Sequence, residues 1–216
     1  MGKYEYIFFD LDGTVFDSGI GIKKSACYAL NKFNISVKNI NNLNRFIGPP
    51  LKNSFMDFYG MSSEQAKLAI SYYREYYSDK GIYEGNIYDG IHDLLKYICS
   101  NGMKAVLSTS KPELFAEKIL KHFDLYQYFT LVSGASLDES LVEKYDIIMN
   151  AFFRLDITDL SKILMVGDRK YDIEGARCAG ISSAGVLYGY GSYKELYSAG
   201  ADYIVSNTEE LVKILL

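Results

Sequence analysis

The sequence has few of the features that mark secreted or membrane proteins. It contains only three cysteines, Cys27, Cys99 and Cys178, which lie far apart and form no C-x-x-C pair. They predict reduced, mostly structural thiols in a cytosolic protein. The N-terminus enters a strand pattern almost at once, so we expect no signal peptide and a cytoplasmic location. No apolar run approaches the roughly 20 residues that span a bilayer, so we expect no membrane association.

Basic tracts are also absent. The chain carries 23 Lys and Arg against 27 Asp and Glu, a net charge of -4, with no basic cluster. Binding to a phosphate backbone normally needs clustered Lys and Arg, so nucleic acid is not an expected partner. With 49% hydrophobic residues over 216 positions, the composition predicts a globular protein of one domain with an insertion, or of two small domains.

The stretch from Tyr6 to Asp17 joins an apolar strand to two carboxylates. Residues 6–9 favour a buried strand and lead directly into Asp10, and Asp12 follows before a Gly-Thr turn. In open α/β sheets ligands bind beyond the carboxyl ends of the strands, which is where a reactive aspartate would be needed. Taken alone, the pattern fits ordinary turn residues equally well, because Asp and Gly are common after strands.

A helical block interrupts the chain after this first strand. Residues 18–83 carry no convincing strand pattern, and Gly48-Pro49-Pro50 must break the chain between two helices. Ser62-x-x-Gln65 is a capping-box pattern that opens the last helix. The stretches with helical spacing are 21–33, 51–59 and 62–77.

This block suggests an inserted domain. We expect residues 1–16 and 84–216 to form the catalytic core, and residues 17–83 to form an all-helical cap. A plain helical segment of one domain is the alternative, but it would leave the first strand without a direct crossover to a second one.

From Ile87 onward, strands and helices alternate. The alternation predicts right-handed crossovers and an α/β fold with a Rossmann-like doubly wound parallel sheet. Helix caps are expected at Asp89 and in the patterns Ser110-x-x-Glu113 and Ser140-x-x-Glu143. The expected strands are 104–108, 129–133, 163–166, 184–187 and 203–205, and the expected helices are 90–99, 110–122, 140–153, 173–179, 193–198 and 209–216.

Polar side chains follow three of the predicted strands. Asp10 and Asp12 follow the first, residues 108–111 (Ser-Thr-Ser-Lys) follow the second, and Asp168 and Asp172 follow the fourth. Four carboxylates at one sheet edge would repel one another unless a cation lay among them. Oxygen ligands without His or Cys nearby indicate Mg²⁺ before Zn²⁺. Capping of the next helix by Asp168 or Asp172 is the alternative.

Phosphoryl transfer is the chemistry that suits this set. One carboxylate can attack phosphorus to give an aspartyl phosphate, and a second can protonate the leaving oxygen and later accept a proton from water. A divalent ion and a lysine would offset the repulsion between nucleophile and phosphate. We expect Thr109 and Ser110 at a helix N-terminus, where free N–H groups favour an anion.

Three segments resemble motifs of the haloacid dehalogenase superfamily. Residues 10–14 (Asp-Leu-Asp-Gly-Thr) resemble its first motif, residues 108–112 its second, and residues 167–172 (Gly-Asp-Arg-Lys-Tyr-Asp) its fourth. Its third motif is only a lysine, and Lys144 is similar in position. The helical insertion after the first motif resembles the first cap type of that superfamily, so the resemblance covers the whole chain.

The resemblance implies a role for each matching residue. Asp10 would be the nucleophile and a Mg²⁺ ligand, and Asp12 the general acid/base, with its backbone carbonyl also on the metal. Lys144 competes with Lys111 and Lys170 for the phosphate-binding role, and the second motif could also be registered on Ser108. The remaining roles would fall to Thr109, Ser110 and Lys144 as phosphate binders and to Asp168 and Asp172 as metal ligands.

Differences between this sequence and the motifs of other superfamily members narrow the choice of branch within the superfamily. Asp12 disfavours a dehalogenase, because halide release needs no protonated oxygen. Ile22 and Leu51 stand about where the similar sugar phosphomutases carry histidine and arginine, which favours a hydrolase. Residues 46–51 and 109–113 resemble the phosphoglycolate phosphatase-like and 5′-nucleotidase-like branch. This implies a phosphatase for a small phosphorylated metabolite, as a monomer or homodimer; a sugar phosphomutase and a non-catalytic phospholigand-binding protein are the alternatives.

Overall fold

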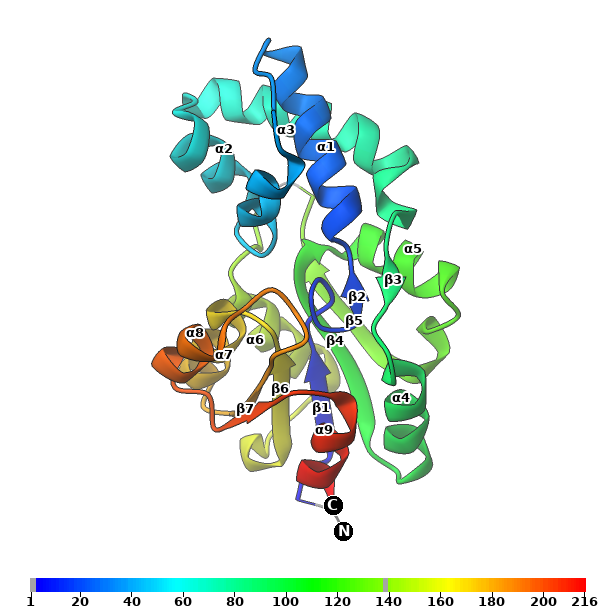
Figure 1. Ribbon diagram of the computed structural model, residues 1–216. Helices are drawn as coiled ribbons and strands as arrows, with labels where there is room; N and C mark the ends of the chain where they lie inside the picture. The colour runs from blue at the N-terminus through cyan, green and yellow to red at the C-terminus, as the bar shows by residue number, and fades with distance from the viewer. Residues whose placement is uncertain (1–2, 138–139) are drawn as a thin grey trace. The chain divides into compact units, whose positions relative to one another are not determined.

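The computed structural model describes residues 3–137 and 140–216 (Figure 1). The chain forms two compact units: Met1–Phe16 with Ile87–Leu216, and Asp17–Asn86. Within the described residues, the helices are too short or too polar to cross a membrane.

The first unit is built on a six-stranded sheet in the order β5-β4-β1-β6-β7-β8, and all its strand pairs are parallel. Strand order reverses beside β1, which lies between β4 and β6, and this is the switch point at which such sheets bind ligands. The predicted α/β doubly wound sheet is confirmed. Its strands are β1 (Tyr6–Phe9), β4 (Lys104–Pro112), β5 (Phe129–Ala135), β6 (Ile163–Gly167), β7 (Ser182–Val186) and β8 (Tyr203–Val205).

Strand register fixes which residues of the two neighbouring strands are level with the end of β1. Phe9 pairs with Leu107 of β4 and with Val166 of β6. The next residues along these strands, Asp10, Ser108 and Gly167, therefore reach the same sheet edge together.

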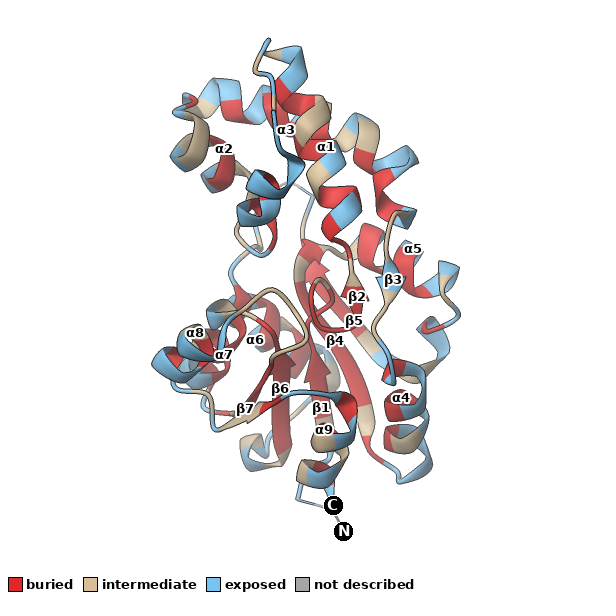
Figure 2. Ribbon diagram, viewed as in Figure 1, coloured by how far each residue is buried: buried red, intermediate tan, exposed pale blue. Residues whose placement is uncertain are grey.

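Helices cover the sheet and bury its apolar side chains. Phe8 of β1 packs in one core cluster with Phe152 and Ala176 from two helices, and the Phe8 and Phe152 ring centroids lie 5.7 Å apart. The strands are largely buried while the outer helix faces are exposed, as Figure 2 shows. The helices of this unit are α4 (Ile91–Ser100), α5 (Glu113–His122), α6 (Lys144–Leu155), α7 (Lys170–Ala179), α8 (Tyr193–Ala199) and α9 (Thr208–Leu215), with short 3-10 turns η3 (Tyr126–Tyr128) and η4 (Leu160–Lys162).

The second unit is helical and has a core of its own. The capping box predicted at Ser62 and Gln65 is confirmed: the Ser62 hydroxyl accepts from the Gln65 N–H, and the Gln65 side chain accepts from the Ser62 N–H. Leu30, Leu43 and Phe55 are fully buried. The elements are α1 (Gly19–Lys32), η1 (Ile40–Phe46), α2 (Leu51–Tyr59), α3 (Ser63–Asp79) and η2 (Gly81–Tyr83).

Both connections between the units are short strands. β2 (Phe16–Asp17) and β3 (Asn86–Ile87) pair as a two-stranded sheet. Glu84, which we expected in the core domain, bonds to the helical unit: its carbonyl oxygen accepts from the Gly21 N–H at 3.1 Å, and its Oε1 lies 2.6 Å from Lys24 Nζ.

Three expected helix caps are wrong. Gly90 rather than Asp89 precedes α4, with no side-chain cap. Glu143 precedes α6 without a side-chain cap, and the hydroxyls of Ser140 and Ser136 instead lie 3.1 Å apart. Ser110 does not cap α5, because β4 continues to Pro112 in pairing with β5 and keeps Ser110 extended.

Candidate active site

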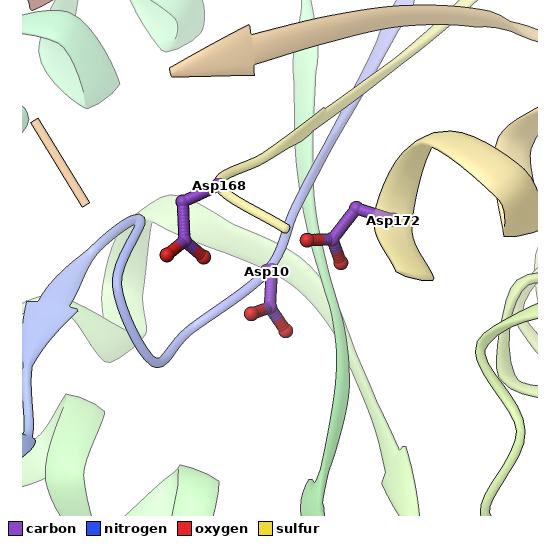
Figure 3. A group of neighbouring side chains, drawn as sticks. All are labelled: Asp10, Asp168 and Asp172. Atoms are coloured by element: carbon purple, nitrogen blue, oxygen red, sulfur yellow. The ribbon is translucent and has the colours of Figure 1, made fainter. Parts of the chain in front are cut away.

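Three aspartates converge at the switch-point edge of the sheet. Asp10 follows β1, and its backbone N–H donates to the Val166 carbonyl oxygen at 2.9 Å, which holds it beside β6. Asp168 follows β6, and Asp172 lies in the first turn of α7. One carboxylate oxygen of each residue lies within 4.8 Å of the others, and all three residues are buried. Figure 3 shows Asp10 between Asp168 and Asp172.

Burial and mutual repulsion make this acidic cluster costly. Burial, with the neighbouring charges of Asp172 and Asp10, raises the pKa of Asp168 well above its usual value. Hydrogen bonds partly offset this: the Tyr190 N–H donates to Asp168 Oδ2 at 2.7 Å and the Thr14 hydroxyl to Oδ1 at 3.4 Å. Burial also raises the pKa of Asp172 to about 6, although Lys144 opposes the shift.

The donor set fits a hard cation. Three buried carboxylates offer oxygen ligands within 4.8 Å of one another, with neither His nor Cys in the group. Mg²⁺ prefers such ligands, and its charge would offset the burial and the repulsion that together raise the pKa of Asp168. Asp10, Asp168 and Asp172 could therefore hold Mg²⁺. The side chain of Asp12 is not in this group, and the metal contact of its backbone carbonyl stays a prediction.

Lys144 supplies a buried positive charge beside the cluster. Its Nζ lies 2.7 Å from Asp10 Oδ1 and 2.8 Å from Asp172 Oδ1, and it donates to the Ser108 carbonyl oxygen at 2.9 Å. Burial lowers the pKa of Lys144, but the charges of Asp10 and Asp172 raise it more, so the ammonium stays protonated.

Close packing against α7 guides the Lys144 side chain. Gly175 lies where a Cβ atom would come 2.7 Å from Lys144 Cγ, so a side chain at position 175 would block the path of the lysine.

The other two candidate lysines differ in position. Lys111 Nζ lies 2.9 Å from Asp12 Oδ2, and both side chains are largely buried. Lys170 is exposed at the start of α7, with its Nζ over the ring of Tyr171. Lys144 and Lys111 therefore reach the predicted catalytic aspartates, whereas the Lys170 ammonium packs on an aromatic ring outside the cluster.

The hydroxyl segment lies in a strand and not at a helix N-terminus, so that expectation is wrong. Thr109 and Ser110 both belong to β4, and α5 begins only at Glu113. Thr109 is buried and its Oγ1 accepts from the Lys111 N–H at 3.2 Å, while Ser110 is half-buried. The Ser108 hydroxyl is buried without a hydrogen-bond partner among residues 3–137 and 140–216. In the register of β1 with β4, Ser108 is level with Asp10, and Thr109 and Ser110 follow it along β4.

Gly13 allows the loop after Asp12 to pass Asp168. Its φ of +89° lies in the region that favours glycine, and a Cβ there would come 2.3 Å from Asp168 Oδ2. The turn is closed by the Gly13 N–H, which donates to the Phe16 carbonyl oxygen at 2.9 Å.

The segment after β7 is a part of the site that we did not predict from the sequence. The Tyr190 backbone N–H donates to Asp168 Oδ2. The pKa of Tyr188 is raised, chiefly by burial and to a smaller extent by the nearby charge of Asp168. The Tyr188 ring centroid lies 5.0 Å from that of Tyr88. A signal was present, because the Gly-rich residues 188–191 follow a predicted strand whose end shares the sheet edge.

Comparison with known proteins agrees with this arrangement. The parallel sheet with an acidic cluster at its switch point places the protein among α/β proteins that bind ligands at this edge of the sheet. The family model for haloacid dehalogenase-like hydrolases matches residues 7–186. The chain belongs to this family, so the predicted membership and the predicted hydrolase class are confirmed.

Similar proteins match over most of the chain. A 5′-nucleotidase of Pseudomonas aeruginosa is 36% identical over 99% of this chain and 96% of its own length. The tyrosine-protein kinase PtkA of Mycobacterium tuberculosis is 36% identical over 87% of this chain and 63% of its own length. The crystal structure of a predicted phosphatase from Clostridium acetobutylicum is 48% identical, with a TM-score of 0.94 over 97% of each chain.

Proposed function

We propose that the protein is a Mg²⁺-dependent phosphatase that hydrolyses a small phosphomonoester through an aspartyl phosphate on Asp10. The observation that carries the proposal is the position of Asp10, whose Oδ1 lies 2.7 Å from the buried Lys144 ammonium and whose carboxylate belongs to the cluster with Asp168 and Asp172. A nucleophile that must approach a phosphate dianion needs compensating positive charge on both sides. Lys144 supplies one side, and the acidic cluster would bind the cation for the other.

The first step forms the aspartyl phosphate. A carboxylate oxygen of Asp10 attacks phosphorus as the bond between phosphorus and the ester oxygen breaks. The protonated Asp12 gives its proton to the departing oxygen, which leaves as an alcohol. Lys144 stabilises the charge on the transferring group, with Thr109 and Ser110 as further donors. Mg²⁺, when held by Asp10, Asp168 and Asp172, would neutralise charge on the phosphate oxygens.

The second step releases phosphate. Asp12, now ionised, accepts a proton from water, and the water oxygen attacks phosphorus. Asp10 leaves as a carboxylate, and Asp12 is again protonated for the next substrate. Asp12 thus acts as an acid in the first step and as a base in the second, and each turnover returns it to its starting state.

Residues 17–83 are assigned the role of a cap that excludes water and reads the leaving group. Support comes from the helical unit, which has its own core and connects to the rest of the chain through two short paired strands. Its boundary with the core would lie within these strands.

For the substrate we favour a nucleoside monophosphate over a small phosphorylated acid such as phosphoglycolate. The choice rests on the 36% identity with a 5′-nucleotidase over nearly the whole of both chains. A screen of phosphorylated metabolites, ranked by kcat/KM, tests it: a nucleotide should rank first, and a higher value for phosphoglycolate would reverse the assignment.

Hydrolysis of p-nitrophenyl phosphate tests the activity itself. We expect Mg²⁺-dependent release of p-nitrophenol, which EDTA and Asp10→Asn each abolish. Asp12→Asn should fold normally and lose most turnover, about 10²-fold or more. Activity that survives both chelation and Asp10→Asn would refute the proposal. Formation of glucose 6-phosphate from β-glucose 1-phosphate would instead identify a phosphomutase. Binding of a phosphorylated ligand without turnover would identify a non-catalytic protein.

A further inference from the structure

Asp12 has two chemically different carboxylate oxygens in this structure. Its Oδ2 lies 2.9 Å from Lys111 Nζ, and the exposed fractions of the two side chains are 6% for Lys111 and 16% for Asp12. Its Oδ1 is buried and has no hydrogen-bond partner among the described residues, 3–137 and 140–216. A buried carboxylate oxygen without a partner is costly, so this oxygen is available to a group that arrives from outside the chain.

Lys111 is itself held firmly by the strand that carries it. Its backbone N–H donates to Thr109 Oγ1 at 3.2 Å, within the irregular end of β4, where pairing with β5 shifts register between Thr109 and Pro112. Lys111 as a whole residue is 9% exposed, and so deeply buried a lysine is unusual outside an ion pair. The hydrogen bond therefore fixes the backbone from which the Lys111 side chain extends.

We infer that Lys111 is a positioning residue that holds Asp12 Oδ2 and thereby makes Oδ1 the oxygen that exchanges the proton with the leaving group. The inference rests on the proposed phosphatase function and adds a residue to it. Lys144 serves Asp10 and Asp172, and Lys111 serves Asp12, so the two buried lysines have separate tasks. Without Lys111 the Asp12 side chain could rotate away from the departing oxygen, and proton transfer depends on that geometry.

The dependence on the leaving group is the readout that separates this role from phosphate binding. An alkyl alcohol is a poor leaving group and needs the proton, whereas p-nitrophenolate leaves readily without it. Lys111→Met should lower kcat/KM for an alkyl phosphate by about 30-fold, and for p-nitrophenyl phosphate by about threefold or less. Lys111→Arg should recover part of the loss, because it keeps a cationic donor. The inhibition constant of inorganic phosphate should stay within about twofold of wild type.

A double-mutant cycle tests whether Lys111 acts through Asp12. In the Asp12→Asn background, Lys111→Met should change alkyl phosphate turnover little, because the proton donor is already gone. Lys96→Met, at an exposed position on α4, is the matched control and should keep wild-type kinetics. Lys111→Gln serves as a second variant that also removes the charge. Thermal unfolding of each variant tests whether the fold is retained.

Two results would overturn the inference. Equal losses for both substrates with a raised phosphate inhibition constant would make Lys111 a phosphate ligand, and unchanged kinetics in both Lys111→Met and Lys111→Gln would make its bond to Asp12 dispensable. Failure of the proposed function looks different, since wild type would then show no hydrolysis that depends on Asp10.

Discussion

Lys144 Nζ lies 2.8 Å from Asp172 Oδ1, and the two side chains are 5% and 2% exposed. Each comes from the first turn of its helix, α6 and α7, so this contact joins two successive crossover helices as well as two charges. Because Lys144 also lies 2.7 Å from Asp10 Oδ1, removal of the lysine would leave two buried carboxylates without this compensating charge.

We expect Lys144→Met to destabilise the metal-free protein by about 3 kcal/mol, the usual cost of breaking a buried ion pair from one side. Urea denaturation at pH 7 in EDTA measures it. Lys96→Met should stay within about 0.5 kcal/mol of wild type. Adding Asp172→Asn to Lys144→Met should restore part of the loss, and strictly additive effects would argue against the pair.

Stability of the metal-free protein should fall as pH rises through about 6. Burial raises the pKa of Asp172 to about 6, whereas an unfolded Asp has a pKa of about 4. Between these values the folded protein binds more protons than the unfolded one, so its free energy of unfolding decreases with rising pH. The measurement is urea denaturation of wild type and Asp172→Asn in EDTA at pH 5 and 7. Wild type should lose stability relative to the variant, and a constant difference would contradict the prediction.

Asp168→Asn should separate stability from metal binding. The substitution removes one charge from a repulsive buried cluster, so the metal-free variant should be at least as stable as wild type. Its affinity for Mg²⁺ should fall at least about tenfold, because a charged ligand is lost. The rise of Tm with added Mg²⁺ measures the affinity. Asp93→Asn, at an exposed position on α4, should behave as wild type, and an undiminished response in Asp168→Asn would exclude Asp168 as a ligand.

Gly13→Ala should cost more than backbone strain alone. Gly13 has a φ of +89° and its Cβ would collide with Asp168, whereas Gly200 has a φ of +88° and a Cβ there would meet no heavy atom within 4 Å. Gly200→Ala should therefore cost about 1 kcal/mol from strain. Gly13→Ala should cost more and also weaken the Mg²⁺-dependent rise of Tm. Equal costs with an intact metal response would show that the loop has room for a side chain.

Local patterns were sufficient for much of the fold. Helix α2 occupies Leu51–Tyr59 and strand β8 Tyr203–Val205, both within the predicted ranges. Helix α2 has strong signals at both ends, with Pro50 before it and Gly60, in a left-handed backbone conformation, after it. The central strand β1 was equally clear, because an apolar run that ends at Asp10 is typical of a buried strand in a parallel sheet.

Features that depend on tertiary pairing were not predictable. Ser110 looks like a helix cap in sequence, but the pairing of β4 with β5 keeps it in the strand. The two-residue strands β2 and β3 have no periodicity to detect, because they exist only through each other. For the site, the sequence placed Lys144 and Lys111 at similar strand or helix ends, and only side-chain geometry assigns one to Asp10 and the other to Asp12.

The close approach of Gly175 to the Lys144 stem has a consequence for how this protein can change over evolutionary time. Any chain that gains a side chain at position 175 must reroute or lose the lysine at 144, since a Cβ would lie 2.7 Å from its Cγ. Positions 144 and 175 should therefore covary among homologous sequences, and the glycine should be retained wherever the buried lysine is kept.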